Sequence, residues 1–471
     1  MSKYNRQAAE NDSKTRFNFV LPSYLKRNKV FFVVALVCIT LTLYFLRPEL
    51  TRAQFPAQQA EFLKVTNRVY CATGYALGNV IYIITDKSVV VVDTTESQSA
   101  ARATFEKFRK VSQLPVSYII YTHHHGDHIN GAKVFKGETT KIIAQKRFVQ
   151  ELANYRQLLP YNRRVNAVQF GVSLPPAERG VRLATNISPK GTPGQQELGY
   201  LPPDILFDEK YSFEEGGVRF ELYHTLGETF DHLMVWMPQE QVLLPGDLFY
   251  NSFPMLSSPM KPVRPVQEWA ESLERMRQLQ PAYLVPSHTK PLKGRTEIDS
   301  VLANYAKAIR YVHDETVKGI NQGLTLEQMR QKIRLPDELA RLPYLTPVYG
   351  RVEWSVNGIY SKYTGWYDFN PSHLNPGPVS TLHRALVEAS GSSGSLVRRS
   401  QKALKDNQPQ LALEITNVIL DAEPNNSEAK ALRVQALEKL AKETINIVEP
   451  NIYFTEAQVL KKKLFIDNSL K

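Results

Sequence analysis

The sequence predicts an α/β fold of layered sheets and helices, followed by an all-α region and preceded by an N-terminal transmembrane helix. Three observations lead to this prediction. Runs of β-branched residues alternate with helical patterns over about residues 65–295. Small apolar residues recur at helical spacing beyond about residue 400. Residues 30–46 form an apolar run without a charged side chain.

Predicted strands and helices follow one another along the α/β region. Residues 116–121 are expected to form a buried strand that ends in a histidine cluster. Residues 150–206 lack clear periodicity and are rich in Pro, Gly and Arg, so we expect a long insertion that partly lines a site. The other predicted strands are 80–84, 88–92, 218–223, 233–237 and 242–244, and the predicted helices are 97–111, 266–278 and 295–319.

The C-terminal part is predicted to be helical. Thr325 and Gln328 have the spacing of a capping box, which predicts a helix start. The sequence Ser-Gly-Ser-Ser-Gly-Ser at 390–395 predicts a flexible hinge. Beyond it, two helical patterns flank Ala-Glu-Pro-Asn-Asn at 422–426, as in a tetratricopeptide-like helical hairpin.

The apolar run predicts a single-pass membrane protein. It has 17 residues, near the lower limit for a spanning helix, and it follows a basic flank. Basic flanks stay cytoplasmic, so we expect the bulk of the chain, with the α/β region, on the extracytoplasmic (periplasmic or lumenal) side. A cleavable signal peptide is the alternative, but the long lead and the lack of an Ala-x-Ala site oppose it. The expected parts are a cytoplasmic basic tail at 1–29, a signal anchor at 30–46 and a linker at 47–64.

Charge and cysteine content exclude two classes of function. The net charge is +12, but residues 1–29 hold seven Lys or Arg against two acids and so supply about five of the twelve. The remaining excess is modest and no nucleic-acid-binding motif accompanies it, so we expect no nucleic-acid partner. Cys38 and Cys71 are the only cysteines, too few for a thiolate zinc site.

A histidine cluster at 122–128, Thr-His-His-His-Gly-Asp-His, predicts a metal centre. His123 and His125 follow directly from a strand, so they can share one cation. Asp127 and His128 come after a Gly turn and can address a second cation. Imidazole and carboxylate groups suit zinc, and two such ions about 3.5–4 Å apart can activate water. A surface polyhistidine patch would explain neither the preceding strand nor the Gly and Asp.

Three downstream positions fit the remaining ligands of such a centre. Glu228, Asp247 and His288 each follow a short apolar strand, so each can lie at the same edge of the sheets. The carboxylate of Asp247 can bridge both ions. His232 competes with Glu228 for the same role, whereas His124 points away from its neighbours in an extended chain.

The ordered series of motifs resembles the metallo-β-lactamase superfamily. It consists of Asp93-Thr94, the 123–128 motif, Gly227-Glu228, Gly246-Asp247 and Ser287-His288. Most members would carry His in place of Glu228, and a glutamate there is similar to the alkylsulfatase branch. Residues 161–164, 169–171, 199–203, 355–360, 363–371 and 451–454 also resemble that branch. The resemblance implies an αββα metallo-β-lactamase sandwich at 65–295, with the insertion at 150–206, and a helical alkylsulfatase-type dimerisation domain at 296–471.

The resemblance also implies a ligand set and a homodimer. Zn(2+) ions, two per chain, would be held by His123, His125 and Glu228 and by Asp127, His128 and His288, with Asp247 bridging. The family commonly has glutamate at the bridging position. Linear alkylsulfatases of this kind carry a further sterol-carrier-like domain, which we expect this chain to lack after Lys471, so a long-chain substrate is not implied.

The expected reaction is hydrolysis of a small-molecule anionic ester, with a sulfate ester favoured, giving alcohol and sulfate. Asp127 and Asp247 would orient the attacking hydroxide. Another ester (lactone, thioester, β-lactam or phosphodiester) would use the same ligands, and a membrane-tethered helical scaffold with a vestigial metal site is the non-enzymatic alternative. Candidates for binding sulfate are Lys261, Arg264, Arg163 and Arg164, and candidates for proton donation are His232 and Tyr200.

Overall fold

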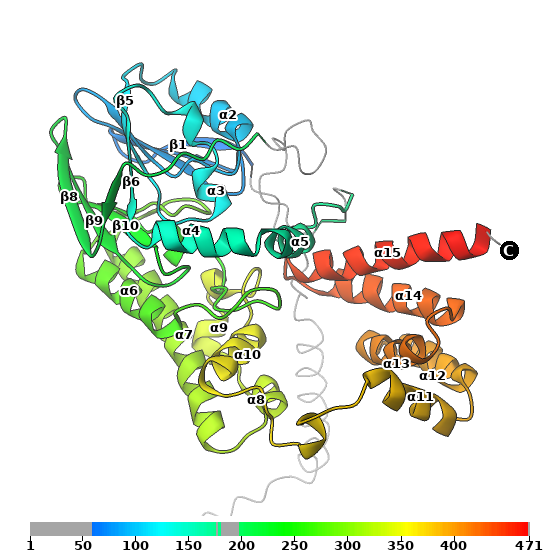
Figure 1. The fold of residues 1–471 in the computed structure, drawn as a ribbon. Helices are drawn as coiled ribbons and strands as arrows, with labels where there is room; N and C mark the ends of the chain where they lie inside the picture. The colour runs from blue at the N-terminus through cyan, green and yellow to red at the C-terminus, as the bar shows by residue number, and fades with distance from the viewer. Residues whose placement is uncertain (1–58, 176–177, 180–196, 470–471) are drawn as a thin grey trace, which may run out of the picture. The chain divides into compact units, whose positions relative to one another are not determined.

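Two β-sheets form the first part of the protein. The computed structural model describes residues 59–175, 178–179 and 197–469. Within these residues one sheet has seven strands, which lie side by side in chain order, and the other has six (Figure 1). The first sheet holds β1 (Glu61–Lys64), β2 (Val69–Thr73), β3 (Val80–Ile84), β4 (Val89–Val92), β5 (Val116–Ile120), β6 (Lys141–Gln145) and β7 (Ile205–Phe207). The second holds β8 (Lys210–Glu215), β9 (Val218–His224), β10 (Leu233–Met237), β11 (Val242–Leu244), β12 (Tyr283–Leu284) and β13 (Leu292–Lys293).

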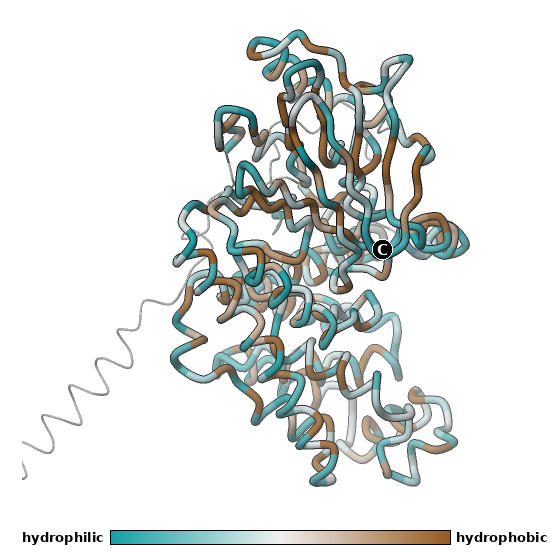
Figure 2. The backbone as a smooth tube through the Cα atoms, turned by 90° about the vertical axis from the view of Figure 1, so that its left-hand side faces the viewer, coloured by the Kyte–Doolittle hydropathy of each residue, from teal (hydrophilic) through white to brown (hydrophobic). Residues whose placement is uncertain are grey.

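The central strands are buried on both faces because each sheet lies between two apolar layers. All four valines of β4 are fully buried, and β4 to β7 pair in parallel, which explains the continuous β-branched run in the sequence. Val90 faces the second sheet, where it joins a core with Leu222 and Val235. Val89 and Val91 face the opposite way, into a core shared with α2 (Gln98–Phe108). Figure 2 shows the strands as mainly hydrophobic segments.

Helices cover the outer face of the second sheet. α6 (Val266–Gln278) and α7 (Arg295–Asn321) bury Trp269, Leu273 and Ile298 against this face, on the side away from α2 (Figure 1). The order of layers is therefore helix, sheet, sheet, helix, which confirms the predicted αββα arrangement.

The predicted insertion begins with two helices that its sequence did not reveal. α4 (Phe148–Gln157) and α5 (Leu159–Gln169) adjoin at Leu158, and few of their side chains are fully buried. Their weak apolar periodicity explains why a helix was not predicted. The exact limits of the insertion and of the domains stay predictions.

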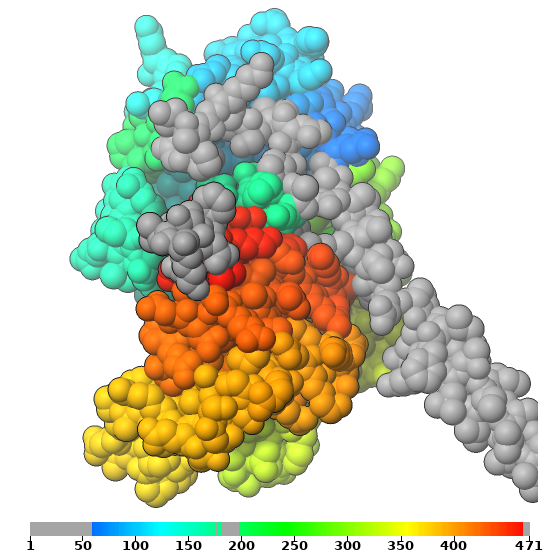
Figure 3. All heavy atoms as spheres, turned by 90° about the vertical axis from the view of Figure 1, so that its right-hand side faces the viewer, coloured from blue at the N-terminus to red at the C-terminus, as the bar shows by residue number. Residues whose placement is uncertain are grey.

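The C-terminal part is all helical, as predicted. Thr325 and Gln328 form the predicted capping box of α8, and α13 and α14 flank residues 423–426 as the expected hairpin. The structure differs at the predicted hinge, because a turn at Gly391 (φ +86°) leads directly into α12. The last helices, orange to red, cover much of one face (Figure 3). The helices of this part are α8 (Leu326–Lys332), α9 (Asp337–Ala340), α10 (Val352–Tyr363), α11 (Val379–Ala389), α12 (Ser393–Lys405), α13 (Pro409–Ala422), α14 (Ser427–Glu443) and α15 (Glu449–Ser469).

The predicted N-terminal transmembrane helix, which was part of the predicted fold class, is not supported. Among the described residues no helix is both long enough and apolar enough to cross a bilayer. The run at 30–46, which is short for a span, lies outside the described residues. We therefore withdraw the signal anchor, the membrane association and the extracytoplasmic placement that depended on it.

The start of α14 offers a test of the helical part. The Asn426 side chain is the N-cap and accepts a hydrogen bond from the Ala429 amide at 2.9 Å. Asn426→Ala should lower the free energy of unfolding by about 1 kcal/mol, because it leaves an orphan amide at the helix terminus. Asn426→Ser, which keeps a capping oxygen and puts no second carboxylate beside Glu423, should cost clearly less than Asn426→Ala. Urea unfolding followed by circular dichroism measures both, and equal losses would show that the cap contributes nothing.

Candidate metal centre

The histidine cluster lies in the loop that joins β5 to the short helix α3 (Gly126–Ile129). His125 is in an extended conformation at the N-cap of α3, and the helix turns Asp127 and His128 back toward it. Nε2 of His123 lies 2.9 Å from Nδ1 of His125. The loop therefore gathers all four predicted ligands on one side, as the motif spacing led us to expect.

Side chains from three later loops complete the cluster. Glu228 lies between β9 and β10, Asp247 in the turn η4 (Gly246–Leu248) after β11, and His288 after β12. The structure therefore brings the seven predicted ligands together into three overlapping groups, in each of which the potential ligand atoms lie within 4.8 Å of one another. The first group is His123, His128 and Asp247. The second is His123, His125 and Glu228, and the third is Asp127, His128 and His288.

The carboxylate of Asp247 lies at the centre of the seven side chains. Its Oδ2 is 3.1 Å from Nε2 of His288, 3.5 Å from Nε2 of His128 and 3.9 Å from Nε2 of His123. Of these neighbours, His123 also belongs to the group with His125 and Glu228, and His128 and His288 belong to the group with Asp127. This is the position expected for a carboxylate shared by two cations, although an aspartate reaches less far than a glutamate.

A second buried carboxylate, Asp93, supports the cluster through hydrogen bonds. Asp93 is fully buried and accepts four hydrogen bonds from three residues in two segments of the chain. The donors are the Thr122 amide (2.9 Å), the Thr122 hydroxyl (2.9 Å), Nδ1 of His128 (2.8 Å) and the Ser287 hydroxyl (2.6 Å). Asp93 therefore fixes the tautomer and orientation of His128 and ties the 122–128 loop to the loop before His288.

Two other imidazole rings are also fixed through Nδ1. Nδ1 of His123 lies 3.0 Å from the Thr122 hydroxyl, whose own proton goes to Asp93. Nδ1 of His288 donates to the Leu77 carbonyl at 2.8 Å. In His123, His128 and His288 alike, the second nitrogen, Nε2, is left facing Asp247.

The rival candidate His232 lies beneath the cluster and not in it. Its Nε2 accepts a hydrogen bond from the Asp247 amide at 3.1 Å, and its Nδ1 pairs with the Thr225 hydroxyl at 3.1 Å. Gly246 (φ +61°) allows this contact, because a Cβ there would lie 2.4 Å from Nε2 of His232. His232 therefore positions the Asp247 turn. His124 likewise turns away from the cluster, to the buried Asp231 at 2.8 Å.

The crowding of imidazoles and carboxylates shifts their pKa values in opposite directions. Burial, together with the neighbouring His128, holds the pKa of His123 well below its usual value. Burial also lowers the pKa of His288, but Asp247 and Asp127 outweigh this effect and raise it to about 9. Burial also acts to lower the pKa of His128, but Asp247, Asp127 and Asp93 outweigh it and hold this pKa well above normal. Protons on two imidazoles thus balance negative charge that the carboxylates concentrate here.

Glu228 shares its buried position with Arg264. Burial raises the pKa of Glu228 to about 7, although the guanidinium of Arg264 acts to lower it. The two side chains form a buried ion pair, and Arg264 also lies 5.8 Å from the centre of the Trp269 ring. Arg264 is therefore engaged with Glu228 and does not line the neighbouring cavity.

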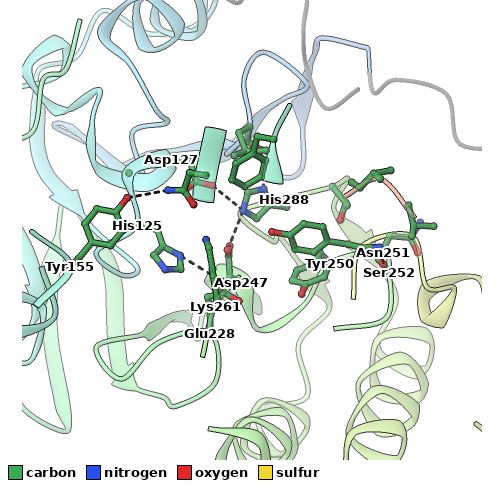
Figure 4. A pocket seen from close by; sticks show the side chains of 18 residues that line it. His125, Asp127, Tyr155, Glu228, Asp247, Tyr250, Asn251, Ser252, Lys261 and His288 are labelled. Carbon is green, nitrogen blue, oxygen red and sulfur yellow. Dashed lines mark hydrogen bonds and ion pairs between the residues drawn. The ribbon is translucent and has the colours of Figure 1, made fainter. Parts of the chain in front are cut away.

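A cavity of about 170 Å³ opens beside the cluster. Figure 4 shows His125, Asp127, Glu228, Asp247 and His288 on its wall. The remaining walls come from segments distant in sequence. These further lining residues are Leu77, Gly126, Tyr155, Asn166, Phe170, Tyr250, Asn251, Ser252, Lys261, Thr289, Val348, Tyr349 and Ile447.

Lys261 is the one predicted anion-binding residue that lines the cavity. Its half-buried side chain lies beside the cluster (Figure 4). Within the described part of the chain no carboxylate lies at ion-pair distance from it. Burial, with Arg264 nearby, lowers the pKa of its ammonium. Such a partly desolvated, unpaired cation is well placed to meet an anionic ligand.

The other predicted substrate residues lie elsewhere. Arg163 and Arg164 are exposed on α5 and do not line the cavity. Tyr200 packs against Tyr121 and Phe148, with ring centres 6.3 Å apart in each pair, and is not in the cavity wall either.

Several wall residues were not predicted as site residues, although segment 169–171 resembles the alkylsulfatase branch. Tyr155 lies in α4 and Phe170 directly follows α5, two helices that were not predicted, and Tyr349 comes from the helical part. One signal near Tyr349 was available. A Cβ at Gly350 would lie 2.1 Å from the Pro254 carbonyl, so this glycine marks a close approach of the 346–350 loop to the segment after Asp247.

The residues present fit a divalent metal centre. The donor atoms are imidazole nitrogens and carboxylate oxygens, the set that suits zinc and similar ions. Nε2 of His128 and Oδ1 of Asp247 are buried and have no hydrogen-bond partner among the described residues. Buried polar atoms rarely remain unpaired unless something else binds them.

Family comparisons agree with this geometry. Residues 74–288 match the Metallo-beta-lactamase superfamily, and residues 325–463 match the family Alkyl sulfatase dimerisation. A linear primary-alkylsulfatase from a Pseudomonas species is 28% identical over 395 residues, which cover 82% of this chain and 74% of that protein. The alkyl/aryl-sulfatase BDS1 of Saccharomyces cerevisiae is 28% identical over 415 residues, covering 85% and 64%.

A solved structure extends the similarity to three dimensions. The stereoselective inverting sec-alkylsulfatase Pisa1 from a Pseudomonas species superposes with a TM-score of 0.78 at 26% identity, covering 85% of this chain and 65% of Pisa1. The chain thus spans slightly less than two thirds of Pisa1 and of the yeast protein. We conclude that this chain contains a metallo-beta-lactamase superfamily domain at residues 74–288 and an alkyl sulfatase dimerisation domain at residues 325–463, and that alkylsulfatases are among its homologues.

Proposed function

We propose that this protein hydrolyses sulfate esters at a centre of two divalent cations, with zinc as the natural occupant. The observation that carries the proposal is the convergence of seven imidazole and carboxylate side chains beside a cavity that is also lined by Lys261, a cation with no ion-pair partner among the described residues. The curated relatives are alkylsulfatases, which supports a metal-dependent sulfuric ester hydrolase.

The ligands divide into two sets that share one member. His123, His125 and Glu228 would hold one ion, and Asp127, His128 and His288 the other, with Asp247 between them. Bound divalent cations act as Lewis acids that polarise the ester and acidify water.

The chain's own residues would orient and neutralise the reactants. The carboxylates of Asp127 and Asp247 face the cavity, where they can accept hydrogen bonds from the attacking water. Lys261 would bind the sulfate oxygens by a charge-assisted hydrogen bond. Arg264 would act indirectly, by keeping Glu228 ionised in a buried place.

The proton donor for the leaving alcohol would come from the cavity wall. Both ring nitrogens of His232 are engaged, and Tyr200 does not line the cavity. Tyr155 is better placed, since it lines the cavity and its phenol accepts a hydrogen bond from Asn166 at 3.1 Å, which leaves its own proton free to donate.

We also propose that the protein is a homodimer, joined through an exposed segment at residues 363–386. Trp366 is 76% exposed and Phe369 is 85% exposed, which is unusual for such large apolar side chains. Phe369 has φ +64°, and the next turn is held by Asp368, which pairs with His373 at 2.7 Å. The segment lies within the part that matches the dimerisation family. Its exposed large apolar residues are Tyr363, Trp366, Phe369, Leu374, Val379, Leu382 and Leu386.

A first prediction concerns metal affinity. Asp93→Asn should weaken zinc binding by about 10–100-fold, because an amide cannot accept all four hydrogen bonds that now orient His128 and its neighbours. Competition against a chromogenic chelator measures the affinity. Asp86→Asn, an exposed change outside the cluster, should leave it unchanged. An Asp93→Asn protein with wild-type affinity would contradict this role.

A second prediction concerns the reaction. The purified protein should release sulfate from alkyl sulfates, lose this activity with a chelator, and lose it with His123→Ala. Activity only on a lactone, thioester, β-lactam or phosphodiester panel would overturn the sulfatase assignment, and the absence of bound metal would favour the scaffold alternative.

Lys261 allows a sharper form of the same test. Lys261→Met should raise KM for alkyl sulfates by about tenfold or more, since a hydrogen bond to a charged group contributes about 1.5–3 kcal/mol. Lys141→Met, which removes an exposed cation from β6, is the matched control and should leave KM unchanged. Equal KM values for the two variants would rule out Lys261 as the sulfate-binding cation.

A third prediction concerns the homodimer. The double variant Trp366→Ala/Phe369→Ala should weaken self-association by at least about 100-fold, since buried aromatic anchors contribute about 2 kcal/mol or more each. Sedimentation velocity should then show a dimer for the wild type and a monomer for the variant. The control Val149→Ala/Leu158→Ala removes two apolar side chains that are also exposed, 53% and 59%, near α4. A variant that stays dimeric would exclude this surface, and a monomeric wild type would exclude the dimer.

A further inference from the structure

One wall of the cavity is supplied by the helical part of the chain. Val348 and Tyr349 come from the loop before α10, and Ile447 from the segment between α14 and α15. The two segments are joined directly, because the Ile447 amide donates to the Val348 carbonyl at 2.8 Å. We refer to Val348, Tyr349 and Ile447 as the helical wall.

A single buried side chain, Asn446, holds the helical wall together. Its Nδ2 donates to the Tyr349 carbonyl at 2.9 Å and to the Pro347 carbonyl at 3.1 Å, the two carbonyls on either side of Val348. Its Oδ1 accepts from the Val448 amide at 2.8 Å and from the Glu449 amide at 3.2 Å, at the start of α15. Asn446 is only 1% exposed. Each donor and acceptor of this amide is thus used, and the set links a cavity loop to a helix start.

The same loop is anchored on its other side to the metal-centre domain. The Tyr349 amide donates to the Ser252 hydroxyl at 2.9 Å, and Ser252 itself lines the cavity in the segment after Asp247. The Tyr349 ring meets the Tyr250 ring edge to face at 5.7 Å. Without the Asn446 side chain, the loop would keep its hydrogen bond to Ser252 and lose the two hydrogen bonds at the carbonyls on either side of Val348.

The helical wall contributes apolar surface to a cavity that also holds ionic groups. Asp127, Asp247, His288 and Lys261 supply charge, whereas Val348 and Ile447 supply only hydrocarbon. An ester of sulfate has the same two halves, a charged head and an organic group.

We propose that Asn446 is a positioning residue that fixes the helical wall, and that the wall limits the size of the organic group of the ester. The helical domain would then set substrate selectivity in addition to pairing two copies. This inference rests on the proposed sulfate ester hydrolysis.

The experiment compares two substrates in two variants. Asn446→Ala removes all four hydrogen bonds, and Asn446→Asp keeps the acceptor toward α15 but loses both donors to the loop. In each variant the ratio of kcat/KM for decyl sulfate to that for ethyl sulfate should rise by about tenfold, because a loosened wall limits the longer organic group less. The change should lie in KM, with kcat for ethyl sulfate nearly unchanged. Hydrogen exchange should be faster at the Tyr349 and Ile447 amides.

Asn426→Ala is the matched control, because it also removes a helix-capping asparagine of the helical part but makes no contact with the cavity wall. It should lower stability without altering the substrate ratio. An unchanged ratio in both Asn446 variants, or an equal change in Asn426→Ala, would overturn the inference. If the wild-type protein hydrolyses neither ester, the proposed function is overturned, and so is the proposed role of the wall in substrate selectivity. Hydrogen exchange would still decide whether Asn446 fixes the helical wall.

Discussion

The buried carboxylate of Asp93 is the interaction on which the metal centre depends. It accepts hydrogen bonds from Thr122, His128 and Ser287 and so joins the start of the histidine loop to the loop of His288. The backbone of Asp93 has φ +58°, an uncommon value outside glycine, although aspartate tolerates it better than most residues. A strained backbone position at the end of β4 thus supports the one acceptor that joins these two loops.

The ligands converge because the ends of buried strands meet at one edge of the two sheets. β5 leads to the histidine loop, and β11 and β12, which pair in parallel, lead to Asp247 and His288. Parallel neighbours deliver the residues that follow them to the same side of a sheet. The αββα core therefore fixes the centre, and the helices α4 and α5 and the helical wall add the surfaces that enclose a ligand.

The sequence was sufficient for those features that rest on short-range patterns. The convergence of the seven candidate ligands could be predicted because the segments that carry them follow apolar strands. The sequence could not distinguish Lys261 from Arg264, because both are cations on one loop and only packing engages Arg264 with Glu228. The wall residues Tyr155, Tyr349 and Ile447 escaped prediction, since their proximity depends on contacts across long sequence separations. The membrane helix was predicted from apolarity alone, and 17 residues are marginal for that argument.

The charge of the site connects the metal centre to the class of substrate. Asp93, Asp127, Asp247 and Glu228 together carry four negative charges when ionised, and Arg264 and Lys261 supply two positive ones. In the protein alone, raised pKa values on His128 and His288 provide part of the missing charge. Two divalent cations would replace those protons. Their four positive charges, with Arg264 and Lys261 and against the four carboxylates, would leave an excess of about two positive charges around the cavity. Such a site favours an anion over a neutral ester, which is the physical reason to prefer a sulfate ester over a lactone as the substrate of these ligands.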